Sequence, residues 1–222
     1  MCRRLKEFKD TCWLIIFTLD LITHKYPIIT SVENLPYDCF SITACSPSLG
    51  GVIISSSNAL IYVDQASRKT ALPTNGWTSR VTDLTLQALR MDELDRDLHL
   101  EGSSITFMDE HTFFLILKDG TVYPVDLSMD GKIFSRLSMG PPLARTTIPS
   151  TACSLHGGNA FFIGSTAGSS VILRAVKNEE VTTIENQEDS PTAVVDPPQT
   201  MIFDDEDGIY LLNFTFHHLN FF

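Results

Sequence analysis

The stretch HTFFLILKDGTVYPVDL at residues 111–127 decides the fold class. Its apolar run, 113–117, is followed by Asp119-Gly120 and by a second β-prone run that starts at Val122. Because Asp-Gly supplies the positive φ angles that tight turns demand, this stretch predicts a β-hairpin. Two other stretches, GGVIISSSNALIYVD (50–64) and NAFFIGSTAGSSVILR (159–174), repeat the order of apolar strand, small-residue turn and apolar strand.

Repeated hairpins of this kind favour a β-propeller over other all-β architectures. The three stretches start roughly 60 and 48 residues apart, and propeller blades recur every 40 to 50 residues or so. Short strands separated by turn residues fill residues 11–176, which is also compatible with a sandwich or a barrel. Only Val81 to Leu100 could be argued to be helical, and a strand pair with a polar loop fits this segment about as well. We expect strands at 12–19, 27–32, 40–44, 52–55, 60–63, 105–108, 112–117, 122–127, 133–137, 161–164 and 170–175.

The negative charge is concentrated in one segment. The 222-residue chain has a formal net charge of -11, and residues 177–207 hold ten carboxylates against one lysine. This segment also holds three prolines and few aromatic residues, so we expect an acidic, disordered insertion at 177–207 and a return strand at 208–216. A near-neutral body without a basic face argues against direct binding of a nucleic-acid backbone.

The N-terminal end superficially resembles a signal peptide, because basic residues precede the apolar run 12–17. The run is too short to cross a membrane, and no small-residue cleavage site follows it. We therefore expect a buried strand, with Trp13 in the core. Residues 1–10 and 217–222 look atypical. The five cysteines show no CxxC pair and no zinc-ligand spacing, so we expect reduced thiols.

The sequence offers no catalytic motif, and we expect no catalytic, cofactor-binding or metal-binding residues. The acidic run 204–207 is contiguous inside a flexible segment, so it is interpreted as a solvated charge run rather than a cation site. Two residues of the loop ALPTNGWTSR (71–80) are candidates for a partner contact, Trp77 and Arg80. Trp77 either fills the end of a propeller or anchors a partner.

The stretch LPYDCFSITACSPSLGGVIISSSNALIYVDQASRKTALPTNGW (35–77) resembles the large propeller subunit of the cleavage and polyadenylation specificity factor, above all its fungal form. Its informative pieces are LPYDCF, the Gly-Gly-Val turn, NALIYVDQ and ALPTNGW. LILKDGTVYPVDL (115–127) and FFIGSTAGSSVILR (161–174) are similar to the same family. These two patterns are looser, and propeller scaffolds of a cullin ubiquitin ligase and of a splicing factor share them.

The resemblance implies a partial seven-bladed propeller of about four blades, the first of three in the family, with the acidic segment as an inserted loop. It implies a non-enzymatic nuclear scaffold in pre-mRNA 3′-end cleavage and polyadenylation. The implied partners are a WD-repeat subunit and a CCCH zinc-finger subunit that recognise the polyadenylation signal, so pre-mRNA is reached only through the complex. No membrane and no small-molecule substrate is implied. A propeller adaptor of a cullin ubiquitin ligase and a truncated, non-functional gene fragment remain alternatives.

Overall fold

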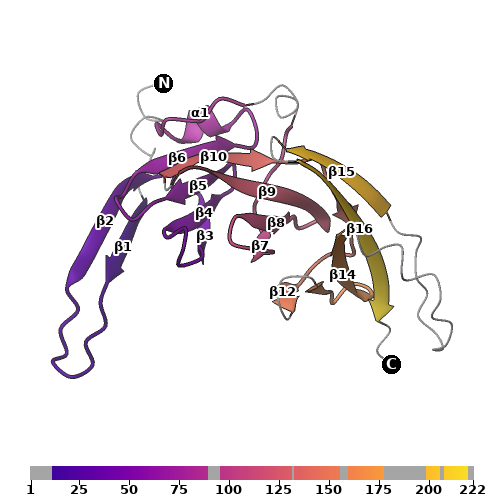
Figure 1. Cartoon of the computed structure of the whole chain (residues 1–222). Coiled ribbons are helices and arrows are strands. Elements are labelled where there is room, and N and C mark those ends of the chain that lie inside the picture. The colour runs from indigo at the N-terminus through magenta and orange to yellow at the C-terminus, as the bar shows by residue number, and fades with distance from the viewer. Residues whose placement is uncertain are drawn as a thin grey trace. The chain divides into compact units, whose positions relative to one another are not determined.

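A computed structural model describes residues 12–89, 96–131, 133–155, 160–177, 199–205 and 208–219 (Figure 1). Within these ranges the chain forms small antiparallel sheets and one short helix, α1 (Thr78–Val81), so the expected all-β class is confirmed. The chain divides into two compact units. The first unit comprises Met1–Glu101 and Asp126–Met139, and the second comprises Gly102–Val125 and Gly140–Phe222.

A four-stranded antiparallel sheet forms the centre of the first unit. Its strands β3 (Cys39–Ala44), β4 (Val52–Ser56), β5 (Ala59–Val63) and β6 (Lys69–Pro73) lie in chain order. Every residue of β5 is buried, because this strand is covered on both faces and paired on both edges. β6 was not predicted, because its sequence KTALP holds only one large apolar side chain, that of Leu72. Pairing with β5 makes this short segment a strand.

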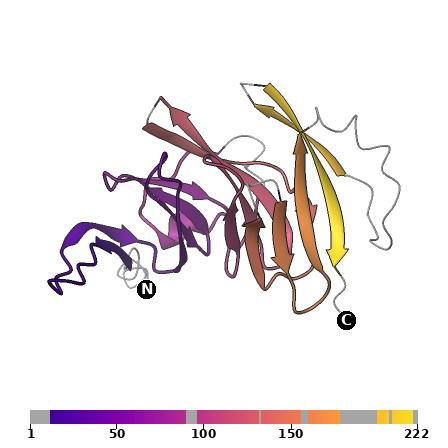
Figure 2. The ribbon, with the colours of Figure 1, turned by 60° about the horizontal axis from the view of Figure 1, so that its bottom comes forward.

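A hairpin of two strands, β1 (Cys12–Phe17) and β2 (Ile28–Leu35), precedes this sheet. Leu14, Val32 and Leu35 are buried with residues of β4 and β5 in one hydrophobic cluster. In Figures 1 and 2 the turn of the hairpin projects away from β3 to β5. The register shifts near Asn34, which has a φ of 59°. Asn34 therefore lies at a β-bulge inside β2.

The expected burial of the segment 12–17 is wrong for most of its side chains. Trp13, assigned to the core, is 62% exposed, and Leu14 is the one residue of β1 that is fully buried. Successive residues of a strand point to opposite faces. Only the face that carries Leu14 meets the hydrophobic cluster, and a two-stranded sheet provides no second layer for the face of Trp13. The apolar run predicted a strand that is buried on both faces, whereas only the Leu14 face of β1 packs against other described residues.

Two side chains form hydrogen bonds with the backbone of β10 (Ile133–Met139), the strand that follows β9 (Thr121–Asp130). The Gln87 amide donates to the Leu137 carbonyl at 2.5 Å and accepts from the Leu137 N–H at 3.1 Å. The Arg96 guanidinium donates to the Met139 carbonyl at 2.6 Å. The described residues between 82 and 100 form neither a helix nor a strand, apart from a single bridge from Leu86 to β6. Both readings of Val81 to Leu100 are therefore wrong for these residues.

The second unit begins with β7 (Ser104–Phe107), β8 (Thr112–Ile116) and the first half of β9, with β11 (Ala144–Arg145) paired to β9. Its core gathers residues of these strands and of a second sheet, with Phe114 and Phe161 in edge-to-face contact at 4.7 Å between ring centroids. Such a pair contributes about 0.5 to 1.5 kcal/mol beyond its buried area. The hairpin predicted from residues 111–127 is present as β8 and β9.

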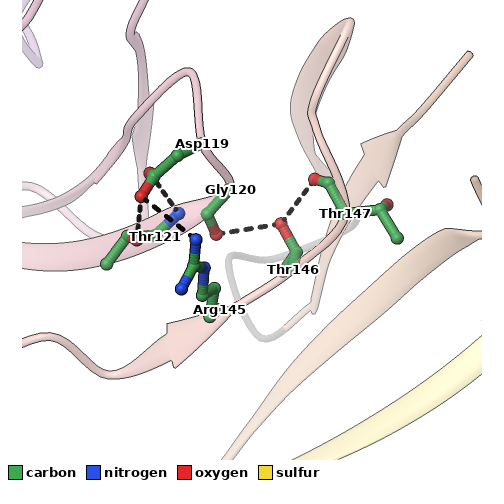
Figure 3. A network of polar contacts seen from close by, with 6 residues as sticks. All are labelled: Asp119, Gly120, Thr121, Arg145, Thr146 and Thr147. Carbon is green, nitrogen blue, oxygen red and sulfur yellow. Dashed lines mark hydrogen bonds and ion pairs between the residues drawn. The ribbon is translucent and has the colours of Figure 1, made fainter. Parts of the chain in front are cut away.

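The turn between β8 and β9 is held by a polar network (Figure 3). Asp119 accepts from the Thr121 N–H at 3.0 Å and from the Thr121 hydroxyl at 2.9 Å, and Arg145 lies 3.9 Å from its carboxylate. The Gly120 carbonyl accepts from the Thr146 N–H at 2.8 Å. The network joins a turn to the strand beside it, so we interpret it as structural.

The second sheet of this unit comprises β12 (Thr151–Leu155), β13 (Ala160–Gly164), β14 (Ser170–Lys177), β15 (Gln199–Asp205) and β16 (Gly208–Leu219). Its strand order is β12-β13-β14-β16-β15. The sequence analysis expected β13 and β14, but it missed β12 and β15. Residues 199–205, placed in the acidic insertion, form β15, whose backbone pairs with β16. Residues 156–159 and 178–198 lie outside the described residues.

Candidate partner-binding surface

The loop that carries the two candidate residues follows β6 and leads into α1. Thr74 and Asn75 are buried, whereas Gly76 and Trp77 are exposed. Trp77 is the residue before the helix, and its N–H donates to the Asn75 side-chain oxygen at 3.0 Å. In an Asx turn, an Asn or Asp side chain accepts such a bond from the backbone N–H two residues further along the chain. The turn therefore fixes where the Trp77 backbone leaves the sheet.

Two buried asparagines form the base of this loop. The Asn75 amide donates to Asn58 Oδ1 at 3.0 Å and to the Leu98 carbonyl at 2.8 Å. The Asn58 amide in turn donates to the Asp38 carboxylate at 2.7 Å. The Thr78 hydroxyl lies 2.5 Å from the Asn58 carbonyl. One oxygen of this carboxylate, Asp38 Oδ1, is buried without a hydrogen-bond partner. The bonds that are made hold the loop in place, because breaking one would leave a desolvated group unpaired. The loop is therefore a rigid platform.

Trp77 and Arg80 stack on each other on top of this platform. The Arg80 guanidinium carbon lies 4.6 Å from the centre of the Trp77 ring, within the range of a cation–π contact. The Arg80 N–H donates to the Trp77 carbonyl at 2.8 Å, which closes the first turn of α1. The Trp77 side chain is 53% exposed and Arg80 is also exposed. The structure thus brings together the two residues that the sequence analysis named.

This pair offers a flat apolar ring edge and guanidinium N–H donors at one place on the surface. Tryptophan and arginine are the residue types most enriched among the energetic anchors of protein interfaces. A stacked guanidinium keeps its planar donors available for a carboxylate. Because Trp77 is 53% exposed, it does not fill the core of its own unit.

The asparagine base is the part of the site that sequence reasoning missed. Neither Asn58 nor Asn75 was among the candidate residues indicated by the sequence. The sequence shows one asparagine before β5 and another after β6. Their positions in the sequence do not indicate that they meet. Only pairing of β5 with β6, which joins Ala59 to Pro73, brings the two residues together.

The described ranges bring together no set of side chains with the geometry of a metal site. No cluster of three or more His, Cys, Asp or Glu side chains that could hold a metal ion occurs there. Within the described ranges, Cys12, Cys39, Cys45 and Cys153 form no disulfide. Burial raises the pKa of the Cys45 thiol to about 11, so it is protonated at neutral pH and a poor nucleophile. In the described part of the chain, no helix is long and apolar enough to cross a membrane.

Comparison with known proteins places the sequence beside one group. The chain is 33% identical over 172 residues to protein cft1 of Neurospora crassa, a match that covers 74% of the chain. It is 32% identical over 189 residues to protein cft1 of Schizosaccharomyces pombe, over 78% of the chain. It is 27% identical over 181 residues to the cleavage and polyadenylation specificity factor subunit 1 of Drosophila melanogaster. No protein-family model matches the sequence. The matched regions are 11 to 13% of the length of these relatives.

Proposed function

Because the chain belongs to the family of protein cft1 and the cleavage and polyadenylation specificity factor subunit 1, we propose that it serves pre-mRNA 3′-end cleavage and polyadenylation as a non-enzymatic scaffold. The observation that carries this proposal is the match to cft1 proteins across about three quarters of the chain. The names of the relatives give the process. The role of scaffold comes from the resemblance of residues 35–77 to the large propeller subunit of that factor.

The proposed architecture is a set of propeller blades from a seven-bladed ring. The four-stranded sheet β3-β4-β5-β6 and the strands β12, β13, β14 and β16 have the strand number and antiparallel order of blades. We propose that residues 11–176 make up about four such blades and that 177–207 are an insertion within them. The blade assignment rests on this strand order together with the family resemblance.

Within this role, Trp77 and Arg80 are the residues that we propose for a contact with another subunit. Their support is threefold: an exposed aromatic ring, a guanidinium stacked on it, and a base of buried hydrogen bonds that holds both in place. A rigid anchor loses little conformational entropy on binding, so its contact area is converted into affinity efficiently. The proposed partners are the WD-repeat and CCCH zinc-finger subunits, and pre-mRNA is reached through them in the nucleus.

Affinity purification tests the proposal. The full chain, expressed with a small tag in the cells that encode it, should enrich subunits of the cleavage and polyadenylation machinery over a tag-only control. Enrichment of cullin and its ligase components instead would favour the ubiquitin-ligase adaptor. Enrichment of neither group would contradict the scaffold role and favour a non-functional gene fragment, which sequencing of the transcript across both ends would check.

The contact residues are tested in the same experiment. The double substitution Trp77→Ala with Arg80→Ala should lower the recovery of at least one polyadenylation subunit, because it removes the ring and the guanidinium together. Tyr37→Ala is the matched control, since Tyr37 is an equally exposed aromatic residue of the same unit, at 55%. Equal recovery with both variants would refute the assignment of the contact and leave the scaffold role intact.

A further inference from the structure

The loop beneath Trp77 contains a chemically labile pair of residues. Asn75 is the one asparagine of the chain that is followed by a glycine. In such a pair the backbone nitrogen of the glycine can attack the side-chain carbonyl carbon of the asparagine, because a glycine has no Cβ to hinder the approach. Asparagine belongs to the thermolabile residue types. The pair Asn75-Gly76 is therefore the place where spontaneous loss of a side-chain amide is chemically most favoured.

The backbone does not require a glycine at position 76. An added Cβ would meet no atom within 4 Å, and the φ angle of Gly76 lies outside the left-handed region. Gly120 differs on both points, because its φ is 87° and an added Cβ would overlap the Thr146 carbonyl oxygen. Gly76 is also exposed, so water and hydroxide reach it. Its lack of a side chain thus affects the reactivity of Asn75 rather than the fold.

The hydrogen bonds of the Asn75 side chain oppose this reaction. Its nitrogen donates to Asn58 Oδ1 at 3.0 Å and to the Leu98 carbonyl at 2.8 Å, and only 7% of the residue is exposed. The same nitrogen has to leave as ammonia, so both bonds must break before the reaction can finish. The side-chain oxygen is held as well, because it accepts from the Trp77 N–H at 3.0 Å. Asn75 can therefore react only when the asparagine base opens.

We propose that Asn75 is a deamidation site whose rate is set by the opening of the asparagine base. The Gly76 nitrogen gives its proton to hydroxide and bonds to Asn75 Cγ. The bond from Cγ to Nδ2 breaks, and Nδ2 takes a proton from water and leaves as ammonia. Water then opens the resulting succinimide ring at either carbonyl, which gives aspartate or isoaspartate at position 75. The solvent supplies every co-reactant, and no electron is transferred.

The product would dismantle the support of Trp77 and Arg80. A carboxylate only accepts hydrogen bonds, so Asn58 Oδ1 would face an acceptor where it now faces a donor. Turning the Asn58 amide round does not help, because its nitrogen donates to the Asp38 carboxylate and its oxygen would then face that group. Unpaired buried acceptors are costly, so the loop would move away from this base. Deamidation is thus an irreversible switch that releases the stacked pair.

Mass spectrometry of the full chain after incubation in mildly alkaline buffer tests the site. Trypsin cuts after Lys69 and Arg80, so residue 75 lies in the peptide TALPTNGWTSR (70–80). Deamidation adds a single mass unit to this peptide, and the succinimide route gives two products, which chromatography separates. Two hydrogen bonds of ordinary net strength lower the population of the open base roughly 30-fold. The folded wild type should therefore deamidate roughly 30-fold more slowly than the same chain in urea.

Three variants separate local opening from general loss of stability. Asn58→Ala removes one acceptor of the Asn75 nitrogen and should raise the rate in the folded chain about fivefold. Val63→Ala is the matched control, because Val63 is buried at the far end of β5 and its truncation weakens the same sheet without removing a bond of the base. It should react at the wild-type rate. Gly76→Ala should keep the circular dichroism of the wild type and show little conversion, because its Cβ hinders the attacking nitrogen.

The product is tested by Asn75→Asp in a Trp13→Phe background, where Trp77 is the only fluorophore of its kind. This variant should lower the fluorescence anisotropy of Trp77, because the ring is no longer held by its base. The proposal is overturned if the folded chain converts as fast as the chain in urea, or if Asn58→Ala reacts no faster than Val63→Ala. An unchanged anisotropy in Asn75→Asp would overturn the switch. These measurements involve no partner, so their outcome is independent of the proposed function.

Discussion

Gly120 is the glycine at which the structure leaves least room for a side chain, so Gly120→Ala should strongly destabilise the second unit. Its φ is 87°, in the left-handed region. A Cβ built there would lie 2.8 Å from the Thr147 carbonyl oxygen and from the Thr146 carbonyl carbon. These are backbone atoms, so they cannot swing away as the end of a side chain could. Residues 146–147 would have to move as a segment.

The expected loss of stability is about 3 kcal/mol. Holding a residue other than glycine in the left-handed region costs roughly 1 kcal/mol. Moving residues 146–147 breaks the hydrogen bonds by which the Thr146 N–H and hydroxyl hold the Gly120 carbonyl, at about 1 kcal/mol each. Gly131→Ala is the matched control, because Gly131 has a φ of 60° and nothing lies within 4 Å of its added Cβ. That variant should lose only the first term, about 1 kcal/mol.

Urea unfolding followed by circular dichroism measures both variants, and hydrogen exchange of β8, β9 and β11 locates the loss. Tryptophan fluorescence would not report it, because Trp13 and Trp77 both belong to the first unit. The reasoning fails if Gly120→Ala is no less stable than Gly131→Ala. It also fails if exchange accelerates equally in every sheet, since the argument places the damage at one turn (Figure 3).

Three further outcomes are expected. Partial burial raises the pKa of Asp119, but the bonds from Thr121 and Arg145 outweigh it, so the pKa lies below its usual value. The wild type should therefore be more stable than Asp119→Asn above about pH 4. This difference in the free energy of unfolding should vanish as the pH falls through the lowered pKa, as the urea midpoints of the two proteins would show. Asn75→Ala should cost about 2 to 3 kcal/mol and raise the mobility of Trp77, seen as lower fluorescence anisotropy in a Trp13→Phe background. Phe114→Ala should cost about 3 to 5 kcal/mol, and a double-mutant cycle with Phe161→Ala should show coupling, whereas additive losses would contradict the edge-to-face contact.

Hairpins were predictable because their signals are local. The order of apolar run, Asp119-Gly120 and second apolar run names both strands and the turn, and each of these depends on neighbours in sequence. The strand at β5 was predictable for a similar reason, since ALIYV is apolar throughout and contains the β-prone residues Ile61, Tyr62 and Val63. The resemblance of residues 35–77 to one family was also available in the sequence, and the comparisons confirm that family.

The candidate site was predictable in its residues but not in its construction. Trp77 and Arg80 are three positions apart, a spacing at which side chains meet on one turn of helix. Their stacking depends on the helical turn α1, which was not predicted, because residues 71–80 were interpreted as a loop. The base beneath them was not predictable, because Asn58 precedes β5 and Asn75 follows β6. The two residues meet only after β5 and β6 pair in register.

Which apolar residues are buried was beyond the sequence. Trp13 and Leu14 are adjacent and both apolar, and composition gives no reason to separate them, yet one is exposed and the other is in the core. The same holds for Gln87, whose amide completes the edge of β10 from a segment with no regular structure. Residue order fixes strands and turns through neighbours a few positions away, whereas burial and edge pairing depend on contacts between segments tens of residues apart. Those contacts exist only when the strands have chosen their faces and partners.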